Sequence, residues 1–139
     1  MIAVDTNILV YAHREEYPRH ARAKARIVEL ARGPAPWGIP VFCLGEFVRV
    51  TTHRRVHSPP SSLQQATAFL DRLCESESFR LLLPDVEYWT DLRTTLELGD
   101  ARGNLAFDAQ IAAVCVHHGA TLLTADRDFA RFSFKTELL

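Results

Sequence analysis

The sequence has few cysteines and no long apolar run, and both absences narrow the class of protein. Its three cysteines, Cys43, Cys74 and Cys115, are far apart and include no Cys-x-x-Cys pair. This usage argues against a cysteine zinc site or a disulfide framework and favours a reducing cytoplasm. No stretch approaches the roughly 18 uncharged apolar residues of a membrane span. Asp5 also interrupts the apolar N-terminus too early for a signal peptide. We therefore expect a cytoplasmic protein without a membrane segment.

Positive charge is not in excess either. The chain carries 16 basic and 17 acidic residues, for a net charge of −1 at pH 7. That balance does not favour nucleic-acid binding if the charges are spread evenly. If four acids gather in one site, however, 16 basic residues face the 13 other acids, an excess of +3. The 139 residues, 47% of them hydrophobic, suit a single domain over 1–139 with a core of its own.

Short apolar segments alternate with segments of helical periodicity. Strands are predicted at 2–4, 81–83 and 121–124, with a very short strand or bend at 37–40 and a final edge strand at 132–135. Helices are predicted at 18–32, 41–52, 63–73, 86–96 and 105–118. Ser62 and Gln65 form a capping box for the third helix, and Asp85 caps the fourth. This alternation predicts an α/β fold with a mostly parallel sheet covered by helices on both faces.

Acidic residues follow two of the predicted strands. Asp5 comes directly after residues 2–4, and Asp126 comes shortly after residues 121–124. Ligands of such sheets bind beyond the carboxyl ends of the strands, at the switch point of strand order, so we expect both side chains at the same rim. Asp128 is a weaker candidate because it lies farther from the strand end. A polar turn is the alternative explanation for both residues.

Two more acids lie in apolar surroundings on predicted helices. Asp108 opens the helix in LAFDAQIAAV, where a favourable contact with the helix dipole is as good an explanation as a functional role. Glu46 lies in PVFCLGEFVRV, where an ion pair with Arg49 is the alternative. Gly45 beside Glu46 suits close approach by a ligand or a neighbouring strand, because it has no side chain.

These carboxylates would repel one another in a cluster without a cation. Because no histidine or cysteine accompanies them, the ligand set favours a hard cation, Mg²⁺ or Mn²⁺. A bound metal would explain why Asp5 is tolerated at the end of an apolar strand. His117 and His118 end a helix, and a dipole contact explains them better than a zinc site whose other ligands the sequence does not place.

Four segments, IAVDTNILV, GEFVRV, NLAFDAQIAAV and LLTADRDF, together resemble a PIN-domain ribonuclease and, more narrowly, a VapC toxin of a toxin–antitoxin pair. The resemblance covers essentially the whole chain. It implies a PIN-like three-layer sandwich with about five mostly parallel strands. It also implies a Mg²⁺- or Mn²⁺-dependent endoribonuclease in which water activated by the metal attacks phosphorus in line.

The resemblance implies roles for individual residues. The implied catalytic acids are Asp5, Glu46, Asp108 and Asp126, of which Asp5 and Asp108 are the direct metal ligands. The residues implied to orient these carboxylates or to touch the substrate are Thr6, Asn7, Arg49, Asn104 and Thr124. The last acidic position is the least uniform in the family, so the choice between Asp126 and Asp128 stays open.

Partners follow from the same resemblance. They are an RNA substrate, a small VapB-type antitoxin that inserts a segment into a groove, and a second copy of the chain in a homodimer. The apolar faces of 41–50 and 63–73 form that groove or are ordinary core. The basic segment 49–57 either guides RNA or is a solvated helix end. Transfer RNA, a ribosomal RNA loop and messenger RNA all stay open as targets.

Three other hypotheses compete with a ribonuclease. One is a PIN fold that binds RNA without cutting it. A second is another Mg²⁺-dependent phosphohydrolase, but an aspartyl-phosphate phosphatase needs a carboxylate two residues after its nucleophile, where this chain has Asn7. A third is a phosphorelay receiver, which needs a lysine after a late strand. Lys24 and Lys135 are the only lysines, and neither fits that position.

Overall fold

A parallel β-sheet of five strands forms the centre of the molecule. The computed structural model describes all residues from 1 to 139, and every pairing between neighbouring strands is parallel. The strand order is β3-β2-β1-β4-β5. The strands are β1 (Ile2–Val4), β2 (Trp37–Pro40), β3 (Phe79–Leu82), β4 (Thr121–Thr124) and β5 (Thr136–Leu138). The chain builds outward from β1 on one side and then returns to its other side with β4, so the strand order switches at β1.

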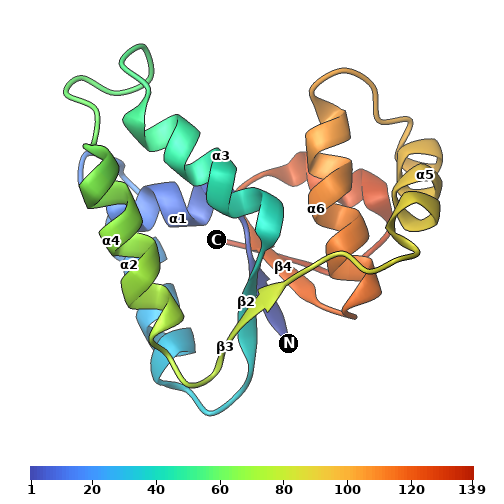
Figure 1. The fold of residues 1–139 in the computed structure, drawn as a ribbon, viewed down its shortest axis with the longest axis horizontal. Helices are drawn as coiled ribbons and strands as arrows, with labels where there is room; N and C mark the ends of the chain where they lie inside the picture. Colours follow the sequence, from blue (N-terminus) through green and yellow to red (C-terminus); the bar gives the residue numbers. More distant parts are fainter.

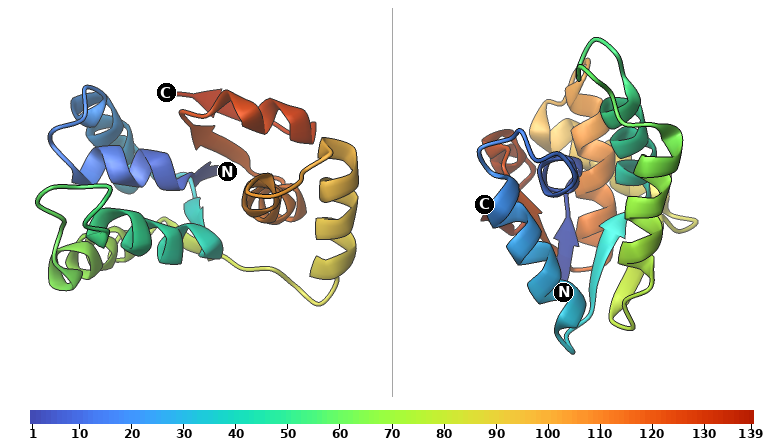
Figure 2. Two further views of the ribbon diagram at one scale, coloured as in Figure 1. Left: turned by 90° about the horizontal axis from the view of Figure 1, so that it is seen from above. Right: turned by 90° about the vertical axis from the view of Figure 1, so that its left-hand side faces the viewer.

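Helices cover both faces of this sheet. They are α1 (Thr6–His13), α2 (His20–Arg32), α3 (Val41–Thr52), α4 (Leu63–Cys74), α5 (Tyr88–Gly99) and α6 (Leu105–His117), with a 3₁₀-helix η1 (Arg127–Phe132). Figures 1 and 2 show α1, α2 and α4 on one side of the sheet and α5 and α6 on the other. Helix α3 follows β2 directly and lies at the end where β1 also finishes. The predicted three-layer α/β sandwich is therefore confirmed.

One apolar core holds the layers together. Trp37 of β2 and Phe47 of α3 are fully buried in it, as are Leu122 and Leu123 of β4, the strand next to the central strand β1. Helix α6 contributes residues 111–115, all of them buried, because this stretch packs against the sheet and against α5. None of the helices combines the length and the apolar character needed to cross a lipid bilayer.

Several local predictions are wrong. Helix α1 is absent from the sequence-based prediction: its buried residues fall on several sides, so its sequence shows no clear helical stripe. The last strand is Thr136–Leu138 and not 132–135, because η1 occupies the chain up to Phe132 and Ser133 adopts a left-handed conformation with φ 55°. Asp85 does not cap α5. It accepts a hydrogen bond from the Glu87 amide, and the helix begins at Tyr88.

Other boundaries differ by a few residues. Helix α2 begins at His20 and not at Pro18, and β3 begins at Phe79, two residues before the predicted strand. The segment 37–40 is a full strand buried along its whole length. The capping box of Ser62 and Gln65 at the start of α4 is confirmed by both of its hydrogen bonds.

Candidate active site

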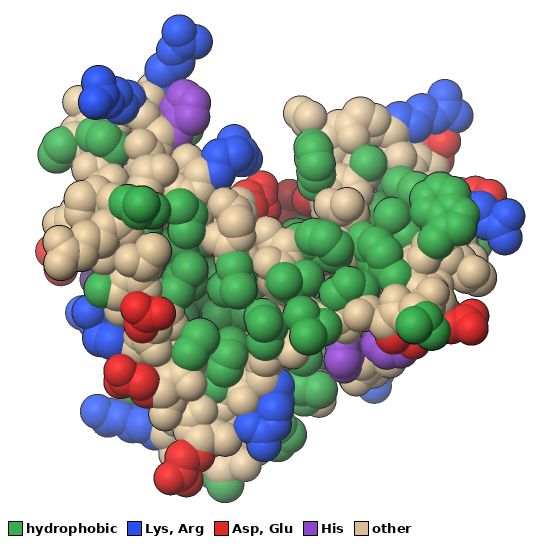
Figure 3. Space-filling view, in the orientation of Figure 1, with side chains coloured by type: hydrophobic (Ala, Val, Ile, Leu, Met, Phe, Trp, Pro, Cys, Tyr) green, Lys and Arg blue, Asp and Glu red, His purple; other side chains and the backbone are tan.

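The four predicted acids come together at the carboxyl end of the sheet. Asp5 directly follows β1, Asp126 lies two residues after β4, Glu46 is on α3 and Asp108 is in the first turn of α6. All four line one cleft of about 270 Å³. Figure 3 shows acidic side chains at the bottom of a notch, between the part of the surface that carries α3 and the part that carries α6. The expectation that Asp5 and Asp126 share a rim is therefore confirmed.

Asp5 is the most deeply held of these acids, with only 3% of its surface exposed. Its Oδ1 accepts a hydrogen bond from the backbone amide of Thr6 at 2.7 Å. Its Oδ2 accepts two more, from the hydroxyl of Thr124 at 2.6 Å and from the side-chain amide of Asn7. The strand pairing continues through Asp5 itself, whose backbone amide donates to the carbonyl of Leu123. The carboxylate is thus fixed between the ends of β1 and β4.

Asn7 and Thr124 link the two strand ends further. The side-chain oxygen of Asn7 accepts a hydrogen bond from the Ala125 amide, and its nitrogen also donates to the Thr124 hydroxyl. That hydroxyl in turn accepts from the backbone amide of Asp126. Together with Thr6, three of the residues predicted to orient the carboxylates therefore donate hydrogen bonds to Asp5.

Glu46 is positioned from two sides. The hydroxyl of Thr6 donates to its Oε2 at 2.7 Å, and Arg49 lies 3.5 Å from its Oε1. The sequence left an ion pair with Arg49 as the alternative to a functional role for Glu46. The structure shows that Glu46 forms this ion pair and also lines the cleft. Because the Arg49 side chain is 64% exposed, the pair contributes little to stability and the guanidinium stays accessible.

Burial and mutual repulsion disfavour the charged forms of two acids. Burial is the largest cause that raises the pKa of Asp5 to about 7; hydrogen bonds from Thr124 and Thr6 oppose the rise. Burial also raises the pKa of Asp108 to about 6, followed by the negative charges of Asp126 and Glu46. A cation in the cleft would favour the charged form of both carboxyls.

The structure favours Asp126 over Asp128 as the fourth acid. Asp126 lines the cleft, and its Oδ1 accepts a hydrogen bond from the Asp128 amide at the start of η1. Asp128 is exposed and does not line the cleft. Asn104, predicted to touch the substrate, is also outside the acidic cleft. It lines a neighbouring cavity together with Arg49, Glu46 and Asp108.

The donor groups in the cleft fit a hard divalent cation. Four carboxylates line it, with the hydroxyl of Thr6 and the amide of Asn7 beside them and no histidine or cysteine. No three of these acids place their ligand atoms within 4.8 Å of one another. The oxygen donors suit Mg²⁺ or Mn²⁺ by their chemistry, since Mg²⁺ keeps several waters and takes only one or two carboxylates directly.

The sequence did not single out two aromatic residues of the cleft. Tyr11 and Tyr17 line it, and their rings contact each other with centroids 4.9 Å apart. Tyr11 belongs to α1, and Tyr17 follows it in the loop before α2. No sequence signal pointed to them because α1 itself was not predicted.

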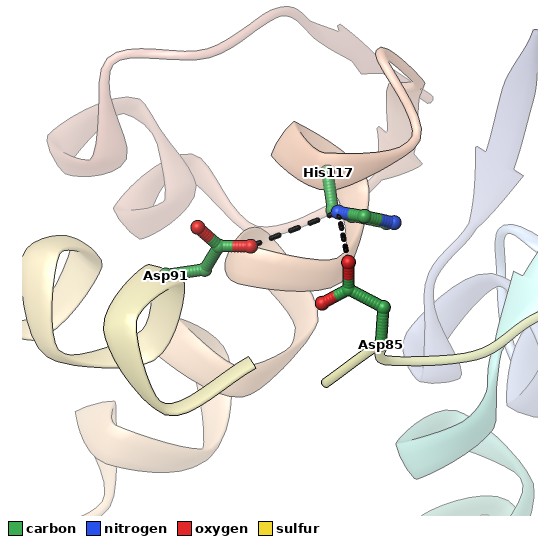
Figure 4. A group of neighbouring side chains, drawn as sticks. All are labelled: Asp85, Asp91 and His117. Carbon is green, nitrogen blue, oxygen red and sulfur yellow. Dashed lines mark ion pairs between the residues drawn. The ribbon is translucent and has the colours of Figure 1, made fainter. Parts of the chain in front are cut away.

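A second group of possible metal ligands lies elsewhere. Figure 4 shows Asp85 and Asp91 on either side of His117, with Nδ1 of His117 3.6 Å from the first carboxylate and 3.7 Å from the second. The three ligand atoms lie within 4.8 Å of one another. The sequence placed no acid beside His117, so this contact was missed. The distances describe a half-exposed ion-pair group, and His118 separately contacts the carbonyl of Leu83.

Comparison with known proteins gives one consistent family. The family model described as PIN domain matches residues 2–135. The chain is 40% identical over 132 residues to ribonuclease VapC43 of Mycobacterium tuberculosis, a match that covers 95% of this chain and 90% of that protein. It is 32% identical over 133 residues to ribonuclease VapC25 of the same organism, covering 96% of this chain and 94% of that protein.

Solved structures show the same fold. VapC20 of Mycobacterium tuberculosis, described as a sarcin–ricin-loop-cleaving toxin, superimposes with a TM-score of 0.71 at 23% identity, covering 96% of each chain. VapBC2 of Rickettsia felis, bound to a promoter DNA fragment, gives a TM-score of 0.68 at 24% identity, covering 99% of this chain and 98% of that one. On the family model and the 40% identity together, the chain belongs to the PIN-domain family and, within it, to the VapC ribonucleases.

Proposed function

We propose that this protein is a divalent-metal-dependent endoribonuclease that acts as the toxin of a VapBC-type pair. The observation that carries the proposal is the convergence of Asp5, Glu46, Asp108 and Asp126 on one cleft, in a chain 40% identical to proteins named VapC ribonucleases. The metal is Mg²⁺ or Mn²⁺, because the cleft offers carboxylate oxygens and no soft ligand.

In this proposal Asp5 and Asp108 hold the ion. When bound, the ion supplies positive charge for the phosphate and lowers the pKa of an attacking water. The hydrogen bonds from Thr6, Asn7 and Thr124 fix the orientation of the Asp5 carboxylate before any ion arrives. That preorganisation reduces the cost of assembling the site when substrate binds.

Glu46, on α3, and Asp126, after β4, also line the cleft. In this proposal they accept hydrogen bonds from the water that attacks the phosphate and take up the proton that this water releases. Thr6 holds Glu46 in place through its hydroxyl. Arg49 and Asn104 lie beside Glu46 and Asp108 in the neighbouring cavity, where a guanidinium and an amide suit the phosphates of the RNA backbone.

The proposed partners are an RNA substrate, a VapB-type antitoxin and a second copy of the chain. VapBC complexes of Haemophilus influenzae and Salmonella typhimurium have folds with TM-scores of 0.66 and 0.64 to this chain, which supports an antitoxin partner. Cleavage of cellular RNA and control by an antitoxin both fit a cytoplasmic protein.

Purified protein incubated with RNA tests the activity. We expect cleavage in Mn²⁺ or Mg²⁺, no cleavage with EDTA, and products with a 5′-phosphate. Sequencing new 5′ ends in cells after brief induction then identifies the RNA class. RNA binding without cleavage in either metal would instead favour a non-catalytic module, and release of phosphate from a small phosphomonoester would favour another phosphohydrolase.

A further inference from the structure

A second cavity, of about 630 Å³, opens beside the acidic cleft. Glu46 and Asp108 line both cavities. The other lining residues on which the inference rests are Phe42, Gly45 and Arg49 of α3, Asn104, and Phe107 and Gln110 of α6. Since the two cavities share residues, a strand with one phosphate at the acids has its neighbouring groups within reach of the second cavity.

The aromatic residues of this cavity differ in how they are held. Phe42 is half-buried and stacks on Tyr88, with ring centroids 5.7 Å apart and planes at 29°. Phe107 is 63% exposed, although it is large and apolar. When another flat ring covers an exposed aromatic ring on the wall of a cavity, the contact is favourable and stabilises the complex. Nucleobases stack on aromatic side chains in this way.

Polar groups surround the same space. Asn104 and Gln110 carry side-chain amides, which can both donate to and accept from the edge of a base. Arg49 is largely exposed beside Glu46 and offers positive charge to the backbone that would carry the base. An aromatic face, amides and a guanidinium next to a catalytic cleft match a nucleotide better than a purely apolar ligand.

Gly45 gives an independent indication. It lies inside α3, where glycine is a poor helix former, and a Cβ built on it meets no heavy atom within 4 Å. Packing therefore does not require glycine at this position. Because Gly45 lines the cavity, its missing side chain leaves the space open for a ligand.

Resting on the proposed function, we propose that this cavity binds one nucleobase of single-stranded RNA next to the scissile phosphate and so sets the sequence preference of cleavage. The base stacks on Phe107, and the amides of Asn104 and Gln110 read its edge. A base stacked in a duplex cannot enter, so the preferred substrate is a loop or an unpaired strand.

The test is cleavage of a random-sequence single-stranded RNA pool in Mn²⁺, with the 5′ ends of the products sequenced. We expect wild type to prefer one base beside the cut. Phe107→Ala should flatten that preference and slow cleavage at preferred sites by about tenfold. Gly45→Leu should do the same by filling the cavity, with a smaller effect for Gly45→Ala. Both Gly45 variants should melt no lower than wild type, because alanine and leucine are better helix formers than glycine.

Trp89→Ala is the matched control. Trp89 is 66% exposed on α5, close to the 63% of Phe107, and lines neither cavity. We expect the Trp89→Ala variant to prefer the same base beside the cut as wild type does. If Phe107→Ala and Gly45→Leu also keep the wild-type preference and rate, the inference is wrong while the nuclease stands. The inference is equally wrong if the two variants turn a dimer into a monomer on gel filtration and leave the preference intact, because the cavity is then a contact between copies.

A binding arm separates this inference from the nuclease proposal. The fluorescein-labelled RNA pool is titrated with each protein in Ca²⁺, without Mn²⁺ or Mg²⁺. Binding about tenfold weaker for Phe107→Ala, with Trp89→Ala at the wild-type value, supports the base site even if no RNA is cut. Equal binding by all three proteins overturns it. If wild type cleaves no RNA in Mn²⁺ or Mg²⁺, that result counts against the proposed nuclease activity and leaves the proposed base site to be decided by the binding measurement.

Discussion

The hydroxyl of Thr124 donates a hydrogen bond of 2.6 Å to Oδ2 of Asp5, joining the carboxyl ends of two adjacent strands. The same hydroxyl accepts from the side-chain amide of Asn7 and from the backbone amide of Asp126. One fully buried oxygen thus connects the first acid of the cleft to the last. The orientation of Asp5 depends on a residue 119 positions away in the chain.

Replacing Thr124 with valine tests this connection. Valine has nearly the same shape but cannot donate to Asp5 or accept from Asp126. We expect the free energy of unfolding to fall by about 1–3 kcal/mol and RNA cleavage to fall by roughly 10- to 100-fold. Urea unfolding and a cleavage assay in Mn²⁺ measure the two effects. Thr124→Ser keeps the hydroxyl and should stay near wild type; equal losses in both variants would contradict the role assigned to it.

The choice of the fourth acid gives a second prediction. Asp126 lines the cleft, whereas Asp128 is exposed and does not. We expect Asp126→Asn to lower the cleavage rate by at least about 100-fold, as Asp108→Asn should, and Asp128→Asn to lower it by less than about threefold. Each variant has the same chemistry and differs only in position. A large loss in Asp128→Asn with little in Asp126→Asn would exchange the two assignments.

Metal-free stability should depend on pH because of Asp5. Its pKa in the folded state is about 7, above the ordinary value of 3.8, so between these values the folded protein binds more protons than the unfolded chain. The slope of unfolding free energy with pH is then negative. The Asp5 contribution favours folding most below pH 4 and is lost as pH rises to about 7, by up to about 4 kcal/mol.

Thermal unfolding in EDTA at pH 5, 6, 7 and 8 measures this effect. We expect the melting temperature to fall across the series and Mn²⁺ to restore more of it at pH 8 than at pH 5, because the ion binds the charged carboxylates. Asp5→Ala should remove most of the difference between pH 5 and pH 8. A melting temperature that rises with pH in the wild type and the variant alike would contradict a raised pKa for Asp5.

Two glycines should respond in opposite ways to alanine. A Cβ on Gly38, inside β2, would lie 2.3 Å from the backbone oxygen of Arg80 on β3, so Gly38→Ala must displace a strand. We expect a loss of about 1–3 kcal/mol or more in the free energy of unfolding. Gly45→Ala meets nothing within 4 Å and should gain up to about 1 kcal/mol. Urea unfolding of both measures the contrast, and destabilisation of similar size in the two would refute it.

The site was largely predictable from sequence because its acids interrupt apolar segments. Asp5 and Asp126 follow buried strands, and Asp108 opens an apolar helix. A charged residue in such places is costly unless a specific interaction compensates it. The parallel sheet then brings these chain positions to one rim. The spatial proximity of Glu46 was not readable from periodicity; the family resemblance supplied it, and the structure places it beside Thr6.

Two features of the structure could not be predicted, each for its own physical reason. Helix α1 buries Thr6, Ile8, Leu9, Val10 and Ala12 between other elements, so the alternation of apolar and polar positions disappears. With α1 unseen, Tyr11 and Tyr17 could not be assigned to the cleft. The second cavity was equally hidden, because Phe107 has the sequence pattern of a core residue in an apolar helix. Only the three-dimensional structure shows its ring exposed.

The place of β4 in the sheet has a consequence during synthesis. This strand pairs with β1 from the other end of the chain, and it brings Thr124 and Asp126 to the cleft. A nascent chain that ends before Thr124 already carries Asp5, Glu46 and Asp108 but lacks the hydroxyl that holds Asp5. Under the proposed function, a ribosome that makes this protein therefore has to translate at least through Asp126 before any competent RNA-cutting centre exists.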